Sequence, residues 1–216
     1  LISENMQLTL DGYLESVEQS VDMAIRIAHD ALTDPDIQYL GSSGTPDEVE
    51  RLDAALRIHC DEVEHAFSSI VNNTHGVITY YYCINHDYGS NEHGFFFRQT
   101  ADGIFEKQPS LNSAELDRND IEHTTWYYSP LKAGSSVWVG PYTAHFLEES
   151  LTVSYVAPIY HKGFVVGVLG MDIPFDILIE QIQPIRVYDT GFVFLMDRDG
   201  RVLYHPDMKK GIEQID

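Results

Sequence analysis

The sequence predicts an α+β domain in which two long helices precede an antiparallel sheet, followed by the start of a second, smaller module. Apolar residues recur at helical spacing through the first third of the chain, and strand-like segments joined by short turns follow. No segment of about 20 to 50 residues repeats, which argues against a solenoid or a propeller. With 216 residues, the chain can bury a sizeable core.

The first predicted element is a helix from about residue 3 to residue 32, ended by Asp34-Pro35. Its apolar positions follow the 4-3-4-3-4 spacing of a heptad seam: Leu10, Leu14, Val17, Val21, Ala24 and Ala28. Such a helix is longer than a small domain needs. We therefore expect a stalk that packs on the domain at one end and on a second copy of itself at the other, giving a homodimer. Packing only within its own monomer is the alternative that the spacing leaves open.

The second predicted helix begins at Thr45-Pro46-Asp47-Glu48, which has the residues of a capping box and a proline suited to the first turn. It extends to about Asn72, and one face is apolar: Val49, Leu52, Leu56, Cys60, Val63, Phe67 and Ile70. Cys60 on this face and Cys83 in the next strand are the only cysteines. Buried free thiols and a bridge between them both remain open.

Strand patterns dominate the chain after Gly76. The expected strands are 77–84, 95–99, 104–107, 152–160, 164–173, 192–196 and 201–205. Hairpin turns are expected at Asp102-Gly103, at 161–163 and at 197–200. Residues 109–122 are polar and predict a loop or short helix, and a further helix is expected at 175–183. The last hairpin has too few strands to be stable alone, so we expect it to open a second module.

The charge balance narrows the function. The chain has 34 acidic residues against 13 Lys and Arg, a net charge of −21. Such a surface repels phosphate backbones, so we expect no nucleic-acid partner. It favours cations or zwitterions as ligands, although acidity that serves only solubility remains open. The longest apolar run, 164–173, is far shorter than the roughly 18 residues of a spanning helix.

Motifs for catalysis are absent from the sequence. It has no serine nucleophile elbow, no HExxH and no P-loop, so we expect no enzyme activity, no cofactor and no metal site. His145-x-x-Glu148 places two metal-ligating side chains on one helical face, but no strong metal spacing accompanies it. A hydrolase or metal enzyme that uses the histidines is therefore only the third hypothesis, after the two given below.

A candidate ligand site centres on Asp172, which ends an apolar strand face that includes Phe164, Val166, Val168 and Gly170. If the 161–163 turn has a two-residue loop, pairing parity places Val153, Tyr155 and Ala157 on the same face. A buried carboxylate needs a cation or hydrogen-bond donors, and an ammonium ligand is one candidate. The alternative is that Asp172 accepts the first amides of the following helix. Aromatic residues that could surround a cation are Trp126, Tyr127, Trp138 and Tyr142, and we expect Trp138 to be ordinary core.

Four segments together resemble the double Cache (dCache) sensor domains of bacterial transmembrane receptors. They are VWVGPY at 137–142, LTVSYVAPIY at 151–160, GFVVGVLGMDIPFDIL at 163–178 and TGFVFLMDRDGRVLYHPD at 190–207. The resemblance implies a stalk and dimerisation helix at 1–33 and a membrane-distal, PAS-like ligand-binding module at 34–174. Residues 175–216 would then be the connecting helix and first hairpin of an incomplete membrane-proximal module.

The resemblance also implies a site and a location. Family members that bind amino acids use an arginine-x-Trp-Tyr motif, a Tyr-x-Asp pair and an Asp at the end of the last distal strand. Trp126, Tyr127, Tyr142 and Asp172 match these positions, whereas Thr124 replaces the arginine and Ala144 the first acid. The implied domain is extracytoplasmic (periplasmic or extracellular) and belongs to an inner- or plasma-membrane receptor such as a chemoreceptor, a histidine kinase or a cyclic-dinucleotide enzyme.

The leading hypothesis is therefore a sensor domain that binds a small molecule, an amine or an amino-acid-like ligand. We expect its pocket to be enclosed by Trp126, Tyr142, Tyr155 and Asp172, with Thr124 and Tyr127 beside them. The second hypothesis is a ligand-free module for dimerisation and signal transmission, whose signal comes from a partner protein.

Overall fold

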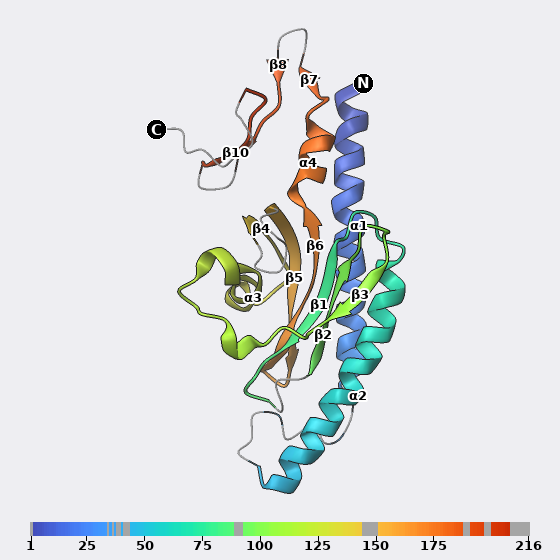
Figure 1. Ribbon diagram of the computed structural model, residues 1–216, viewed down its shortest axis with the longest axis vertical. Coiled ribbons are helices and arrows are strands. Elements are labelled where there is room, and N and C mark those ends of the chain that lie inside the picture. Colours follow the sequence, from blue (N-terminus) through green and yellow to red (C-terminus); the bar gives the residue numbers. More distant parts are fainter. Residues whose placement is uncertain are drawn as a thin grey trace.

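A six-stranded antiparallel sheet separates two long helices from a third, shorter one (Figure 1). The computed structural model describes residues 2–33, 35, 37, 40, 44–88, 93–143, 151–187, 191–196 and 200–207, with side chains except at 2–10 and 186–187. The helices are α1 (Ile2–Asp30), α2 (Pro46–Val71), α3 (Ile121–Ala133) and α4 (Phe175–Ile182). The predicted α+β class and its long first helix are confirmed.

The sheet has the strand order β3-β2-β1-β6-β5-β4. Its strands are β1 (Thr79–Ile84), β2 (Gly94–Gln99), β3 (Phe105–Gln108), β4 (Val137–Thr143), β5 (Leu151–His161) and β6 (Phe164–Pro174). The predicted β2–β3 and β5–β6 hairpins are both present. Two small pairs follow: β7 (Arg186–Val187) with β8 (Gly191–Phe192), and β9 (Leu195–Met196) with β10 (Val202–Tyr204). The β9–β10 pair confirms the third predicted hairpin, while turn residues 197–199 lie outside the described part.

Helix α1 packs within its own monomer over the second half of the predicted seam. Val17, Val21, Ala24 and Ala28 are at most 1% exposed, and α1 contacts α2 and β5 there. The side chain of Leu10 lies outside the described part of the chain. Above the sheet, α1 continues alongside α4 (Figure 1). In this half of the predicted seam, α1 therefore packs within its own monomer, which is the alternative that the sequence left open.

Helix α2 begins as its sequence predicts. The backbone N–H of Thr45 donates to Glu48 Oε2 at 2.7 Å, and the N–H of Glu48 donates back to Thr45 Oγ1 at 3.4 Å. The predicted face is buried from Leu52 to Phe67, but Val49 is 47% exposed. The first turn of α2 extends below the sheet, which leaves Val49 without a surface to cover (Figure 1).

Both cysteines are free and buried, so the bridge that the sequence left open is absent. Burial raises the pKa of the Cys60 thiol to about 12 and also raises that of Cys83. Neither thiol is therefore a nucleophile at neutral pH.

A β-bulge in the central hairpin decides which residues share a face. Lys162 and Gly163 form the predicted two-residue loop, and both have positive φ. The register then shifts, because Tyr160 pairs with Val165 and Ile159 pairs with Gly167. The unpaired Val166 moves the rest of β5 by one residue, and a one-residue shift exchanges the two faces.

The pairing parity inferred from the sequence is therefore wrong. Asp172 lies opposite Ser154 rather than Val153, so Tyr155 belongs to the other face of the sheet. Val166 also packs in the core on the α1 and α2 side, whereas Val168 packs on the α3 side.

Helix α3 covers the face of the sheet that carries Asp172. The sequence predicted only a loop or short helix for 109–122, and the structure has a short 3-10 turn at Ser113–Glu115 before α3. Gly134, with a φ of 69°, ends the helix in a left-handed C-cap. The core under α3 contains Tyr81, Trp126, Tyr142, Val156 and Val168, among others.

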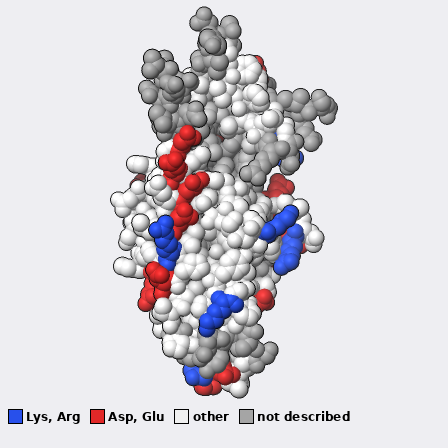
Figure 2. All heavy atoms as spheres, turned by 180° about the vertical axis from the view of Figure 1, so that it is seen from behind, with Lys and Arg blue, Asp and Glu red and all other residues white. Residues whose placement is uncertain are grey.

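No helix among the described residues is long and apolar enough to cross a membrane. On the face behind that of Figure 1, acidic side chains gather in a column, whereas basic side chains are scattered (Figure 2).

Gly167 offers a test of the packing between β1 and β6. A Cβ at this position would collide with the carbonyl oxygen of Cys83, because the two strands approach closely there. We expect Gly167→Ala to lower the free energy of unfolding by about 1–3 kcal/mol, or roughly 2–4 °C in Tm per kcal/mol. Urea denaturation followed by circular dichroism measures this.

Gly12→Ala is the matched control, because Gly12 lies in exposed helix with nothing within 4 Å of its added Cβ. The same chemical change should there raise the free energy of unfolding by about 0.5–1 kcal/mol. Equal effects of the two substitutions would contradict the close approach at Gly167.

Candidate functional site

The candidate site is built around Asp172, whose carboxylate is completely buried near the end of β6. Three hydroxyl groups from neighbouring strands hold it. Ser154 on β5 donates to Oδ1 at 2.6 Å, and Tyr81 on β1 donates to Oδ1 at 3.1 Å. Thr79, also on β1, donates to Oδ2. These hydroxyls, rather than the first backbone amides of α4, hold the carboxylate, so the alternative inferred from the sequence does not describe Asp172.

Tyr142 on β4 extends this network toward the sheet edge. Its hydroxyl lies 2.8 Å from Ser154 Oγ. Because the single hydrogen of Ser154 is directed to Asp172, Tyr142 is the donor in this contact. A chain of two hydrogen bonds therefore leads from Tyr142 through Ser154 to the carboxylate.

Burial raises the pKa of Asp172 to about 6, and the hydrogen bonds from Ser154, Thr79 and Tyr81 oppose the rise. Asp172 forms no ion pair with any described Lys, Arg or His. Arg98 on β2 lies on the same face of the sheet as Asp172, because Thr79 of β1 pairs with Arg98 on one side and with Asp172 on the other. Arg98 nevertheless forms no ion pair with Asp172. At neutral pH the site is thus a buried negative charge held by neutral hydroxyls.

The aromatic residues expected around a ligand are core residues here. Trp126 on α3 is 1% exposed and packs edge-to-face on Tyr81, with 5.0 Å between ring centroids. Tyr127, 5% exposed, packs edge-to-face on Trp126. Thr124 is buried as well, and its hydroxyl lies within hydrogen-bond distance of the carbonyl oxygens of Asp117 and Asp120.

Tyr155 lies away from this group, on the α1 side of the sheet, because of the β-bulge. Its ring contacts Trp138 at a centroid distance of 5.1 Å. The indole N–H of Trp138 donates to Glu18 of α1 at 2.7 Å. Trp138 is partly buried against the main core, as the sequence analysis expected.

A cavity of about 670 Å³ opens beside Tyr142. It is lined by Ile121, Glu122 and Thr125 of α3, by Gly140, Pro141, Tyr142 and Thr143 of β4, by Leu151 of β5 and by Arg201. Of the predicted site residues, Tyr142 lines this cavity, while Trp126 and Asp172 lie behind it in the core. The expected pocket enclosed by Trp126, Tyr142, Tyr155 and Asp172 is therefore not formed, and Ala144 lies outside the described residues.

Sequence reasoning missed the three hydroxyl donors around Asp172. For Ser154 the available signal was its alternation with Thr152 in a largely apolar strand. This signal does not extend to Thr79 and Tyr81 on β1. Assigning Ser154 to the Asp172 face requires the bulge, which the sequence does not indicate.

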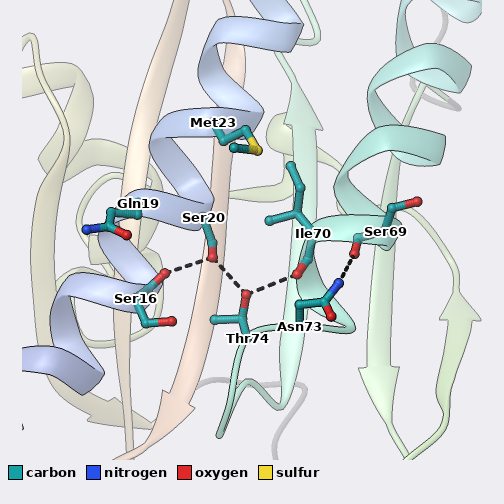
Figure 3. A pocket seen from close by; sticks show the side chains of 8 residues that line it. All are labelled: Ser16, Gln19, Ser20, Met23, Ser69, Ile70, Asn73 and Thr74. Carbon is teal, nitrogen blue, oxygen red and sulfur yellow. Dashed lines mark hydrogen bonds between the residues drawn. The ribbon is translucent and has the colours of Figure 1, made fainter. Parts of the chain in front are cut away.

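A second cavity, an uncharged groove of about 370 Å³, lies between α1 and the end of α2 (Figure 3). Ser20 Oγ lies 2.7 Å from Thr74 Oγ1, and each hydroxyl also lies within hydrogen-bond distance of a carbonyl oxygen, that of Ser16 for Ser20 and that of Ile70 for Thr74. The lining residues are Ser16, Gln19, Ser20, Met23, Ser69, Ile70, Asn73 and Thr74.

A third cavity, a charged cleft of about 310 Å³, lies between α2 and β2–β3. Two close contacts occur among its lining residues: His93 Nε2 lies 2.7 Å from Asp53 Oδ1, and Lys107 Nζ lies 2.6 Å from Glu64 Oε2. Within the described part of the chain, no three His, Cys, Asp or Glu side chains are placed to hold a metal. His145 and Glu148 lie outside that part.

Comparison with known families identifies the fold. The family model described as "Cache domain" (dCache_1) matches residues 1–214. The chain belongs to the Cache domain family. The resemblance found in its sequence is thereby confirmed, and the chain is an extracytoplasmic sensor domain.

Relatives in the family are bacterial chemoreceptors. The chain is 26% identical over 122 residues to the methyl-accepting chemotaxis protein PctB of Pseudomonas aeruginosa, covering 56% of the chain and 19% of that protein. It is 27% identical over 152 residues to the methyl-accepting chemotaxis protein McpB of Bacillus subtilis, covering 70% of the chain and 20% of that protein. The chain thus spans about a fifth of the length of these relatives.

Among solved structures, the chain is similar to the extracellular domain of a candidate histidine kinase, mmHK1S-Z3. The TM-score is 0.54 at 20% identity, covering 90% of this chain and 70% of that one. This likeness supports the fold.

The pKa of Asp172 predicts an unusual pH dependence of stability. Because the pKa of Asp172 rises from 3.8 to about 6 on folding, the native state binds more protons than the unfolded state between pH 3.8 and about pH 6. The contribution of Asp172 to stability is greatest below pH 3.8 and is lost as pH rises through about 6. Relative to Asp172→Asn, the wild-type protein should lose on the order of 2 kcal/mol between pH 4 and pH 7.

Urea denaturation of both proteins across this pH range measures the difference. Asp47→Asn, at a carboxylate whose side chain is 82% exposed, is the control. Its stability should track that of the wild type. A constant difference between wild type and Asp172→Asn would contradict the buried, ionisable state of Asp172.

Proposed function

We propose that this sensor domain binds a small molecule with an ammonium group in the 670 Å³ cavity beside Tyr142. The observation that carries the proposal is the buried carboxylate of Asp172, which has no cationic partner among the described residues. A buried charge of this kind is costly, and a cation placed near it lowers the cost. The net charge of −21 favours the same class of ligand.

Tyr142 connects the cavity to the charge. It lines the cavity and donates to Ser154, which donates to Asp172. An ammonium group against the Tyr142 ring would gain a cation–π contact. It would also interact with the Asp172 charge across a region of low dielectric constant, where such interactions are strong.

The position of Asp172 suits signal transmission. Strand β6 ends at Pro174 and α4 begins at Phe175, so only two residues, Ile173 and Pro174, separate Asp172 from α4. Helix α4 in turn contacts α1. We propose that ligand binding favours one of two arrangements of these helices, and that the full-length protein is a membrane-anchored receptor like its chemotaxis relatives.

One observation favours a second candidate, a ligand-free dimerisation and transmission module. Asp172 already accepts hydrogen bonds from three hydroxyls of its own chain, so its acceptor oxygens are satisfied without a ligand. In that case a partner protein would supply the signal.

A thermal-shift screen with primary amines decides between the two. A ligand at 100 times its Kd adds about 2.7 kcal/mol, which corresponds to roughly 5–10 °C for a domain of this size. The shift should be larger at pH 7.5 than at pH 5, because Asp172 is ionised only above about pH 6. Asp172→Asn should abolish this pH dependence, and Tyr142→Ala should remove the shift itself.

Asp47→Asn removes one exposed negative charge and should respond as the wild type does. A shift in Asp172→Asn that stays larger at pH 7.5 than at pH 5, as in the wild type, would exclude a role for the buried charge. The absence of any shift across the amine series would favour the ligand-free module.

The homodimer also remains a proposal, and the uncharged groove of Figure 3 is the surface we favour for it. Two copies of a chain with a charge of −21 repel each other except where charge is absent. Met23, 54% exposed beside this groove, is an apolar side chain available for the contact.

Met23→Glu should therefore weaken self-association at least tenfold, as measured by analytical ultracentrifugation. The control is Ile58→Glu on α2, where an apolar side chain of similar exposure, 52%, lies away from the groove. A dimer of unchanged strength in Met23→Glu would exclude the groove, and a wild-type monomer at all concentrations would exclude a homodimer of this chain.

A further inference from the structure

We infer that Arg201 binds an anionic group on the ligand, so that one ligand joins the ligand-binding module to the first hairpin of the second module. The inference rests on the proposed function and adds the residue that selects ligands carrying an acidic group beside the ammonium. It follows from which elements form the walls of the cavity beside Tyr142.

The cavity has walls from two parts of the chain that are distant in sequence. Helix α3 and strands β4 and β5 of the six-stranded sheet form most of it. Arg201 comes from the separate β9–β10 sheet and directly precedes β10. A molecule that fills this space touches both sheets.

The charges that line the cavity are complementary to a ligand with two opposite charges. Among the described lining residues, Glu122 is the one acid and Arg201 the one base, and both side chains are exposed. Asp172 adds negative charge behind Tyr142. An ammonium group is therefore favoured on the Tyr142 side, and an anionic group beside Arg201.

A local positive charge favours anion binding at one place in a chain whose overall charge disfavours it. With 34 acidic residues against 13 basic ones, the general field of the protein repels anions. A guanidinium group can offset that field at one place, because it is always charged and presents its N–H donors in a fork that matches a carboxylate. It has enough donors to hold a ligand without losing its contacts within the protein.

Binding through Arg201 would also stabilise the second module. The β9–β10 pair is a sheet of two short strands, and an isolated two-stranded sheet is marginally stable. A ligand held at both ends would fix this hairpin against α3 and β4, whereas a ligand without an anionic group would leave it unchanged.

The experiment compares matched pairs of probes by isothermal titration calorimetry on this 216-residue chain. Each pair is a common L-amino acid and the amine that lacks its carboxyl group. In the wild type, at least one amino acid should bind more tightly than its amine. Arg201→Gln should weaken that amino acid on the order of 10- to 100-fold and leave the amine unchanged. Arg201→Lys, which keeps the charge but not the fork, should give an intermediate loss.

Arg57→Gln is the control, since it removes one exposed positive charge from α2, on the opposite face of the sheet. It should bind both probes as the wild type does. Amide hydrogen exchange gives a second readout: the amino acid, but not the amine, should slow exchange at residues 195–204 in the wild type and not in Arg201→Gln.

The outcomes separate the two proposals. If amines bind but a carboxylate adds no affinity, or if Arg201→Gln keeps the full affinity for the amino acid, the role of Arg201 is overturned and the proposed sensor function stands. If neither member of any pair binds, both proposals fail. Loss of amino-acid binding in Arg57→Gln as well would also overturn a specific role for Arg201, because a general charge effect would then explain it.

Discussion

The buried carboxylate of Asp172 is the constraint on which the α3 side of the molecule depends. An ionised carboxylate away from water needs hydrogen-bond donors, and three strand hydroxyls supply them. Each donor must come from a strand next to Asp172, so the order of β1, β6 and β5 is fixed around it. Tyr142 on β4 and the packing of Trp126 on Tyr81 then follow from the same arrangement.

A single extra residue makes this arrangement possible. Without the bulge at Val166, the two-residue hairpin loop would place Val153 opposite Asp172, and an apolar side chain cannot donate a hydrogen bond. With the bulge, Ser154 takes that position. The bulge also moves Tyr155 to the other face, where it packs with Trp138 near α1. One local irregularity thus sets the polarity of one face and the aromatic packing of the other.

Local signals predicted the elements better than the site. The capping box at Thr45, the long first helix and the β5–β6 loop were readable because each depends on neighbours in sequence. Asp172 was identified because an acid at the end of an apolar strand is conspicuous. The hydroxyl groups that donate to Asp172 and the position of Tyr155 were not identified from the sequence, because both depend on a strand register that changes within the β5–β6 hairpin. Helix α3 was missed because Pro130 and the β-branched or hydroxyl residues of α3, such as Thr124, Thr125 and Ser129, lower its intrinsic helix propensity.

The geometry limits how a ligand can act on Asp172. The carboxylate is sealed from the cavity by Tyr142 and Ser154, so a ligand there reaches it through the electric field and the two hydrogen bonds rather than by contact. Such coupling would carry a signal from the ligand to the helices, because β6 leads directly from Asp172 into α4, and α4 lies beside α1. A ligand that also held Arg201 would act on the segment after α4 at the same time. The helix would then be constrained from both of its ends, which is the kind of differential contact that a population shift between two arrangements requires.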